Sequence, residues 1–428
     1  MRILILDLTH AGDRIGAEYV RAGHEVSIVD VYRTAKAPDM ERVAAAGMRL
    51  LPEAPAEEFD LAVLPVHCPA RFLGQARPKK VISHHEAVGE IVSFPHPVIE
   101  VTGAAGKTST CFAIAQVLAS AGNKVLLHTS RGNLLIDKGV KVLNEIASIA
   151  PASLVELSKT DGYDVAVLEE SLGGTGLGQV CIVTTIGDDY AIAGGTKKAF
   201  DGKVQMVSLA RNTVVFPKKE NDIWAKHVRQ GTRTLTFGRG GDVEVGFDDV
   251  HIGVPASASL SYLGRKIEFD ISSTILGLSY ATALEAATAA CISFGMDLED
   301  VVHGLRAFRG VPGRAEVERI DDWYLVRDRN PGVSARSIEW LLRLIQDRYG
   351  IKDIGLVVDP VNRKICDKLD MDDIMKVARA HPSVKKVYLF EREASGKGQT
   401  DGVERIGGIY DVWARHKVVL WCTKEGYL

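Results

Sequence analysis

The 428-residue sequence predicts an α/β fold with more than one domain, on the basis of three observations. Hydrophobic residues make up 46% of the chain and charged residues 25%, which is typical of ordered globular proteins long enough for two or three separate cores. Short apolar runs alternate with helical periodicity in three successive segments, as expected for parallel sheets covered by helices. One apolar run also leads through a glycine-rich turn into a helix, which indicates a phosphate-binding site.

The first segment ends at a stretch with two prolines, residues 93–97. Prolines disfavour both a helix and a central strand, so this stretch is interpreted as a linker after a domain of residues 1–95. A helix is expected to begin near Gly12. Strands are expected at residues 2–7, 26–31, 61–64 and 80–83.

Charge and cysteine usage exclude several classes of function. The net charge is -3, from 52 basic and 55 acidic residues, so we expect a small-molecule partner and neither nucleic acid nor a membrane surface. The six cysteines form no CxxC pair, which argues against a zinc ribbon or a disulfide framework and favours the cytoplasm. The first apolar run is too short for a signal peptide or a membrane span. No feature of the sequence indicates an oligomeric state.

The second segment carries the strongest motif of the chain. A strand expected at 98–102 runs directly into this motif, and a helix expected at 110–121 follows it. The motif consists of Gly103, Ala104, Ala105, Gly106, Lys107, Thr108 and Ser109. Glycines let the backbone wrap around phosphate oxygens, and the amino terminus of the helix adds partial positive charge. We therefore expect ATP here, with Lys107 on its terminal phosphates and Thr108 or Ser109 on Mg²⁺. The alternative is an ordinary tight turn.

Only two residues separate Gly103 from Gly106, whereas the general P-loop pattern has four. This shorter form resembles the Mur ligase family of carboxylate-activating enzymes. The resemblance implies a three-domain Mur ligase-like α/β architecture. Its parts would be a Rossmann-like substrate domain at 1–95, a central P-loop ATP-binding domain with a parallel sheet and a small β insertion at 96–312, and a Rossmann-like closing domain at 313–428.

Three further segments resemble the metal-binding parts of that family. Residues 167–171 are similar to a strand that ends in a magnesium-binding glutamate, which implies Glu169 as a ligand; the alternative is a solvated acid at a strand end. Residues 183–190 resemble a segment that usually ends in Asp-His, but Tyr190 stands in the histidine place. Either Asp188 or Asp189 replaces the histidine, or the second metal is held differently.

Lys203 aligns with a lysine that many family members carry as a carbamate. A carbamate is a carboxylate on a long arm, able to bridge metals that an ammonium would repel. The alternative interpretation, given equal weight, is a lysine on the surface of a helix, with Lys197 and Lys198 as nearby candidates.

The last part of the chain offers two further nucleotide contacts. Residues 308–316 resemble the family's joint before the third domain, which implies that Arg314 reaches the phosphates and stabilises the charge of phosphoryl transfer; the alternative is a structural salt bridge. Residues 328–331 resemble a family loop in which Asn330 would contact the nucleotide. Small antiparallel strands are expected at 233–237, 243–247 and 265–271.

Weaker matches in all three segments resemble a branch of the family that closes a carbocyclic ring on a nickel tetrapyrrole, with nickel present only as part of the substrate. One such match is the run that contains His84 and His85. These two residues and His10, which follows the first strand, are candidates to face the carboxylates or the nickel of that substrate; the alternative is solvated loop histidines. Two other functions stay open: an amide ligase that adds an amino acid to a cell-wall or cofactor precursor, and a P-loop nucleotide switch.

Overall fold

A computed structural model describes residues 1–187, 189, 191–360, 369–390, 399–400 and 402–425. The chain divides into two compact units. The first contains residues 1–244, 262–264 and 282–304, and the second contains residues 245–261, 265–281 and 305–428. In the part of the chain that the structure describes, no helix has both the length and the apolar character needed to cross a membrane. Asp188 and Tyr190 lie outside the described residues.

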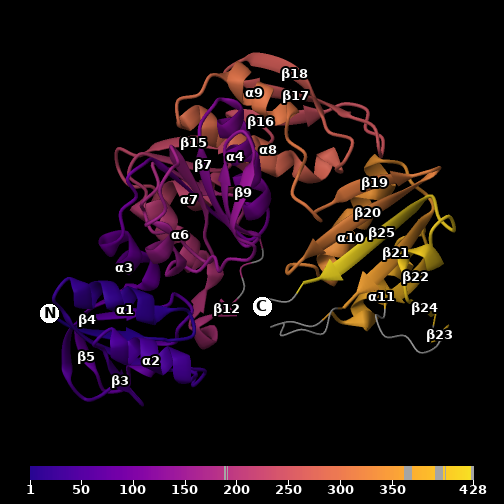
Figure 1. Cartoon of the computed structure of the whole chain (residues 1–428). Helices are drawn as coiled ribbons and strands as arrows, with labels where there is room; N and C mark the ends of the chain where they lie inside the picture. The colour runs from indigo at the N-terminus through magenta and orange to yellow at the C-terminus, as the bar shows by residue number, and fades with distance from the viewer. Residues whose placement is uncertain (188, 190, 361–368, 391–398, 401, 426–428) are drawn as a thin grey trace. The chain divides into compact units, whose positions relative to one another are not determined.

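The first unit begins with a fully parallel sheet in the order β3-β2-β1-β4-β5 (Figure 1). Its strands are β1 (Arg2–Leu6), β2 (Glu25–Val29), β3 (Arg49–Leu51), β4 (Glu58–Leu64) and β5 (Arg77–Ser83). Its helices are α1 (Gly12–Arg21), α2 (Ala37–Ala45), the short η1 (Ala70–Leu73) and α3 (His84–Ile91). The chain runs outward from β1 to β3 on one side and from β4 to β5 on the other, so the strand order reverses between β1 and β4.

Alternation along β1 explains how this sheet is covered. Ile3 and Ile5 pack on one face with Ile15 of α1, while Leu4 and Leu6 belong to a second cluster on the opposite face. Successive side chains of a strand point to opposite faces, and here both faces are apolar. A sheet buried on both faces in this way is typical of parallel α/β folds.

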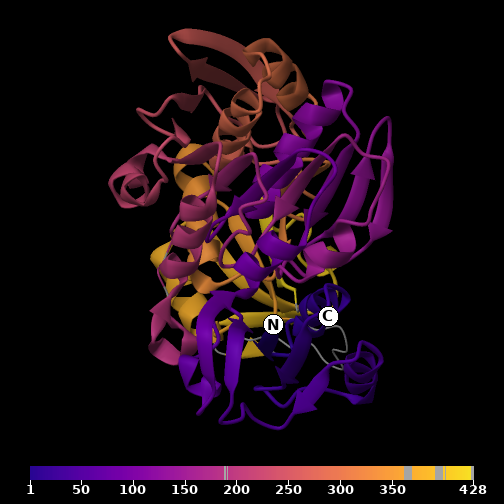
Figure 2. The ribbon, with the colours of Figure 1, turned by 90° about the vertical axis from the view of Figure 1, so that its left-hand side faces the viewer.

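The central sheet of the first unit has the order β15-β14-β11-β6-β10-β7-β8-β9. Its strands are β6 (Val98–Thr102), β7 (Val125–Thr129), β8 (Gly132–Ile136), β9 (Val140–Asn144), β10 (Val165–Glu169), β11 (Val180–Val183), β14 (Thr213–Pro217) and β15 (Arg233–Phe237). Pairs from β15 to β7 are parallel, whereas β8 and β9 form antiparallel pairs at the edge of the purple sheet (Figure 2). The strand before the glycine-rich turn is therefore central and fully buried.

The helices of this part are α4 (Lys107–Ser120), α5 (Ser153–Leu157), α6 (Ala199–Leu209), η3 (Lys218–Glu220), α7 (Asn221–Trp224), α8 (Ala281–Ser293) and α9 (Leu298–Arg306). Between β11 and α6 lies a two-stranded antiparallel pair of β12 (Ala191–Ile192) and β13 (Lys197–Lys198), joined by η2 (Ala193–Gly195). The expected helix after the turn begins at Lys107, three residues earlier than predicted.

The prediction that 233–237 is a small antiparallel strand is wrong. β15 pairs in parallel with β14 over its whole length, and β16 (Val243–Phe247) pairs in parallel with β15 at Val243. These strands extend the central sheet, because alternating hydrophobicity is the same for a parallel and an antiparallel edge and does not report strand direction.

The second unit contains a mixed sheet in the order β19-β20-β25-β21-β22-β24-β23. Its strands are β19 (Glu316–Ile320), β20 (Trp323–Asn330), β21 (Ile354–Asp359), β22 (Val384–Phe390), β23 (Gln399–Thr400), β24 (Val403–Ile406) and β25 (Val418–Lys424). The unit also holds β17 (Ala256–Tyr262), β18 (Arg265–Ile271), η5 (Gly277–Tyr280), α10 (Ala335–Arg343), the π-helix η6 (Leu344–Arg348), α11 (Met371–Ala380) and η7 (Ile409–Asp411). Residues 328–330, expected in a loop, are the last residues of β20.

Candidate functional site

The glycine-rich turn lies between β6 and α4, and its backbone leaves no room for a side chain at Gly103. Gly103 has φ 139°, and a Cβ there would lie 2.0 Å from Thr184 Oγ1. Gly106 has φ 82°. The Ala104 N–H donates to the Thr185 carbonyl at 2.9 Å, which ties the turn to the neighbouring strand end. The sequence therefore places glycine where the conformation and the close approach require it, at the start of a helix able to bind phosphate.

Two polar side chains converge beside this turn. The Thr108 hydroxyl lies 3.0 Å and 2.9 Å from the two carboxylate oxygens of Glu169, which is the last residue of β10 and is 2% exposed. The Ser130 N–H donates to Glu169 at 3.2 Å. Lys107 lies in the same turn and donates to the Gly103 carbonyl at 3.0 Å.

This pair excludes the interpretation of Glu169 as a solvated acid. Oxygen ligands suit Mg²⁺, which usually takes one or two protein ligands and completes its shell with water and phosphate. Thr108 and Glu169 fit that pattern, and among the described residues no three His, Cys, Asp or Glu side chains form a metal cage of their own. Of the two hydroxyls considered in the sequence, Thr108 contacts Glu169. Ser109 lies one residue further along α4.

Lys203 is buried in α6, with 2% of its surface exposed, so it is not a surface lysine. Its Nζ donates to the Ala199 carbonyl at 3.4 Å. Burial lowers its pKa, and the charge of Lys107 adds to this effect, while Asp189 and Glu220 oppose it. A lowered pKa increases the fraction of neutral amine, the form that reacts with carbon dioxide. The alternatives Lys197 and Lys198 are exposed.

Asp189 lies at the start of the segment that leads into α6. One of its carboxylate oxygens accepts a hydrogen bond from Phe200 N at 2.9 Å, and the other lies 3.5 Å from Lys198 Nζ. Its charge also acts on Lys203. Asp189 as a metal ligand stays a prediction, and the other residue considered for that role, Asp188, is outside the described chain.

Glu220 was missed in the sequence. It follows β14 and is 5% exposed. It accepts hydrogen bonds from Thr185 Oγ1 at 2.8 Å, Ile186 N at 2.9 Å and Trp224 Nε1 at 2.9 Å. It therefore fixes the segment after β11, on which the glycine-rich turn rests. No motif surrounds Glu220 or Ser130, so no local signal could have identified either residue.

His84 and His85 are not loop residues. They open α3 and are 1% and 3% exposed, while Ser83 caps the helix by accepting from Glu86 N at 3.0 Å. Burial lowers the pKa of His84 to about 3 and that of His85 to about 4, so both are neutral at pH 7. His85 Nε2 lies 2.9 Å from the Ser171 carbonyl oxygen.

Beside this helix lies a buried pair of carboxyl groups. Glu100 is fully buried and accepts from Thr175 N at 3.1 Å and Gly176 N at 3.2 Å. Glu170 is 1% exposed, and burial and the charge of Glu100 raise its pKa well above the usual value. Burial therefore favours the protonated form of Glu170. Glu170 is buried and directly follows Glu169, whose carboxylate contacts the Thr108 hydroxyl.

Two glycines let helices approach the segment after β10 closely, one on α3 beside the N-terminal sheet and one on α6 of the central part. A Cβ on Gly89 of α3 would lie 2.2 Å from the Thr175 carbonyl oxygen, and one on Gly202 of α6 would lie 1.7 Å from that of Leu172. The helices thus touch the backbone of the segment after β10. We call these two contacts the glycine joint.

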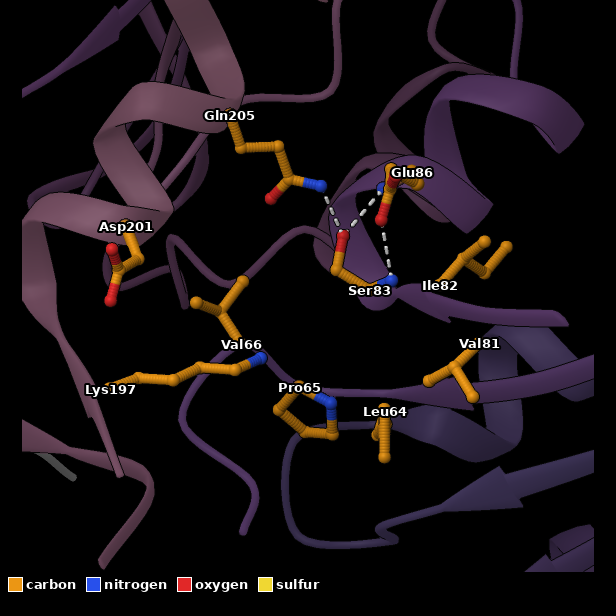
Figure 3. A pocket seen from close by; sticks show the side chains of 10 residues that line it. All are labelled: Leu64, Pro65, Val66, Val81, Ile82, Ser83, Glu86, Lys197, Asp201 and Gln205. Carbon is orange, nitrogen blue, oxygen red and sulfur yellow. Dashed lines mark hydrogen bonds between the residues drawn. The ribbon is translucent and has the colours of Figure 1, made fainter. Parts of the chain in front are cut away.

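A pocket of about 430 Å³ opens near this joint, between the carboxyl ends of β4 and β5 and helix α6 (Figure 3). Gln205 points toward Ser83 and donates to its hydroxyl at 2.5 Å, while Lys197 extends along the wall formed by Val66. The lining residues are Leu64, Pro65, Val66, Val81, Ile82, Ser83, Glu86, Lys197, Asp201 and Gln205. Five apolar and five polar or charged residues line the pocket, so it offers both apolar surface and hydrogen-bonding groups.

Arg314 and Asn330 belong to the second unit. The Arg314 carbonyl accepts a hydrogen bond from the Tyr280 hydroxyl at 2.6 Å, and that hydroxyl accepts one from Val311 N at 3.0 Å. Tyr280 therefore holds the segment that carries the arginine. Asn330 donates to Asp328 at 3.1 Å and accepts from Gly332 N at 2.9 Å. Nucleotide contacts by Arg314 and Asn330 stay predictions.

The fold and this site define a P-loop nucleotide-binding α/β protein. The chain is 32% identical to the coenzyme F(430) synthetase of Methanosarcina acetivorans over 405 residues, which covers 86% of this chain and 85% of that protein. It is 24% identical to the coenzyme F(430) synthetase of Methanocaldococcus jannaschii over 396 residues, 88% of each chain. The crystal structure of MurF ligase from Thermotoga maritima in complex with ADP matches it with a TM-score of 0.58 at 15% identity, covering 93% of this chain and 91% of that one. No protein-family model matches the chain.

The chain belongs to the Mur ligase family of ATP-dependent ligases. The resemblance predicted from the short glycine-rich motif is confirmed, as is the α/β architecture of Mur ligase type with its three sheets. The exact domain boundaries at 95/96 and 312/313 stay a prediction.

Proposed function

We propose that the protein activates a propionate carboxylate of a nickel tetrapyrrole as an acyl phosphate and then closes a carbocyclic ring, converting seco-F430 acid to coenzyme F430. The observation that carries the phosphoryl-transfer half is the contact of Thr108 with Glu169 beside the glycine-rich turn. The similarity to two coenzyme F(430) synthetases over most of the chain supports the choice of substrate.

The chemistry begins with a carboxylate that resists attack because it is anionic and has no good leaving group. In the first step a carboxylate oxygen bonds to the terminal phosphorus of ATP, and the bond from that phosphorus to ADP breaks. The turn at 103–106 holds the phosphates with its backbone N–H groups, and Lys107 places a positive charge beside them. Thr108 and Glu169 would hold Mg²⁺, which supplies charge neutralisation for the moving phosphoryl group.

In the second step a carbon of the same macrocycle attacks the activated carbonyl. Both reactants belong to one molecule, so a site that orients them gains from an effective molarity that can reach about 10⁵–10⁸ M. Burial of Lys203 and its lowered pKa favour a carbamate close to Lys107, where a second negative group could help to bind metal.

The test offers the purified protein ATP, Mg²⁺ and either the nickel seco precursor or a panel of amino acids with cell-wall precursors. We expect phosphate release with the nickel precursor alone, together with a change in its visible absorption because ring closure alters the chromophore. Stimulation only by an amino acid would establish the amide ligase instead. ATP binding without phosphate release under any condition would indicate a nucleotide switch.

A further inference from the structure

Two histidines flank the point where the N-terminal sheet reverses its strand order. His10 follows β1 and His67 follows β4, and their ring centroids lie 4.4 Å apart. Tyr32, which follows β2, lies 5.9 Å from His10 and 6.4 Å from His67 by the same measure. We call these three residues the ring cluster. In open α/β sheets, ligands bind outside the carboxyl ends of the strands at such a reversal, so the ring cluster lies where a ligand is expected.

One member of the ring cluster is held by a buried carboxylate. Asp7 is fully buried, and its Oδ2 contacts His10 Nδ1 while its Oδ1 accepts from Thr9 N at 2.6 Å. Burial opposes ionisation of Asp7, but the hydrogen bond and charge of His10 outweigh it, and the pKa of Asp7 is lowered. An ionised Asp7 keeps the proton of His10 on Nδ1. The lone pair of Nε2 is then available on a side chain that is 35% exposed.

The backbone around this pair is strained. Asp7 has φ 130°, a conformation that L-residues rarely adopt, and a Cβ on Gly12 would lie 2.1 Å from the Asp7 carbonyl oxygen. Such a conformation is unfavourable and persists only where its surroundings enforce it, most often at functional sites. The conformation of the turn from Asp7 to Gly12 therefore lowers the stability of the fold and holds the Asp7 side chain in one orientation.

A short row of side chains connects the ring cluster to the nucleotide site. His84 lies within electrostatic range of Asp7, His10 and His67, and its neighbour His85 contacts the Ser171 carbonyl oxygen at 2.9 Å. Ser171 follows Glu169 by two residues. The ring cluster and Glu169 both belong to the first unit, so their relative placement does not depend on where the second unit lies.

We propose that His10, oriented by Asp7, is the catalytic base that removes the proton from the attacking carbon. This role rests on the proposed function. The proton moves from carbon to His10 Nε2, and the electron pair of that C–H bond forms the new C–C bond to the acyl carbon. The C–O bond between acyl carbon and phosphate breaks, and its electron pair leaves with inorganic phosphate. His10 then returns its proton to solvent through its exposed side.

The test separates activation from ring closure. Hydroxylamine traps an acyl phosphate as a hydroxamate, whereas visible absorption follows the closed ring. For His10→Ala we expect hydroxamate formation within about threefold of wild type and ring closure slowed by about 10²–10⁴-fold, the usual contribution of a general base. ATP would then be consumed without ring product, and added imidazole would restore part of the closure rate. His10→Gln keeps a hydrogen-bond donor but no basic nitrogen and should behave in the same way.

His303→Ala is the matched control, because His303 is exposed on α9, and we expect both rates to stay at wild-type values. Hydroxamate formation also shows that each variant is folded. Ring closure by His10→Ala and His10→Gln at the wild-type rate, with hydroxamate still formed, would overturn the role of His10 and leave the proposed function intact. If the wild-type protein forms no hydroxamate from the nickel precursor, the proposed function fails and the role of His10 fails with it.

Discussion

Replacing Gly103 by alanine tests whether the glycine-rich turn works through its close backbone approach. The added Cβ would lie 2.0 Å from Thr184 Oγ1, 3.0 Å from Thr184 N and 3.1 Å from Thr185 N, at a φ of 139°. The unfavourable φ costs about 1–3 kcal/mol. If Thr184 rotates away, its hydrogen bond to the Ala105 carbonyl at 2.6 Å is lost, at about 0.5–1.5 kcal/mol.

These contributions give an expected loss of about 1.5–4.5 kcal/mol in the free energy of unfolding. Because the turn must also shift, we expect ATP affinity to fall at least tenfold, which is about 1.4 kcal/mol. Denaturant unfolding followed by tryptophan fluorescence measures the first quantity, and calorimetric titration with ATP and Mg²⁺ measures the second.

Two companion variants make the result specific. Gly139→Ala is the matched control, since its Cβ would meet nothing within 4 Å and it has no positive φ, and we expect no change in either quantity. The double variant Gly103→Ala with Thr184→Ala removes the 2.0 Å overlap but keeps the strained φ and the close backbone nitrogens, so recovery should be partial. Gly103→Ala with wild-type ATP affinity and stability within about 0.5 kcal/mol would refute the reasoning.

Three other variants have expected outcomes. Thr108→Val removes the hydroxyl that contacts Glu169, and we expect Mg²⁺-dependent phosphate release to fall by about 10²-fold. The free energy of unfolding should fall by about 1–3 kcal/mol, because the buried carboxylate loses a hydrogen-bond donor. Lys203→Met removes the amine that a carbamate needs, and turnover should be lost while ATP still binds in a titration. Glu170→Gln should flatten the pH dependence of stability. Because the pKa of Glu170 is raised in the folded protein, its contribution to stability is full below the unfolded pKa of 4.5 and is lost as the pH rises through the folded pKa. The loss is at most about 1.4 kcal/mol per pH unit. The matched controls, in the same order, are Thr110→Val, Lys226→Met and Glu145→Gln.

The controls were chosen for what their side chains contact. The Thr110 hydroxyl is buried without a hydrogen-bond partner in the described part of the chain, so valine should fit at little cost. Lys226 and Glu145 are exposed, and their loss should leave turnover and pH dependence unchanged. A Thr110→Val protein as impaired as Thr108→Val would show that any hydroxyl loss in α4 is damaging and would remove the argument for a metal-binding threonine.

The glycine-rich turn could be located from the sequence because residues 103 to 109 form one continuous motif between a strand and a helix. Glu169 was chosen through the family resemblance, and the structure places it in contact with Thr108 of that motif. Nucleotide and metal binding by these residues stays a prediction. Residues whose roles come from distant contacts carried no such signal. Glu220 supports the turn through Thr185, 35 residues away, and His67 meets His10 only because β1 and β4 pair.

The direction and the length of some strands could also not be predicted from the local sequence. The parallel pairing of β15 with β14 depends on the path of the chain between them, not on which residues alternate along either strand. β20 continues through Asn330 because each of its residues from Tyr324 onward has a partner in β25, nearly one hundred residues later. A polar stretch such as 328–330 gives no indication of that partner.

The glycine joint has a practical consequence for exchanging parts between relatives. Gly89 and Gly202 both lie against carbonyl oxygens of the same short segment, 172–175, so the two helices and this segment must fit one another closely. A chimera that imports only residues 1–95 from another ligase would place foreign atoms against that segment. Successful transplants of substrate preference should therefore carry the partner stretches along with the first sheet.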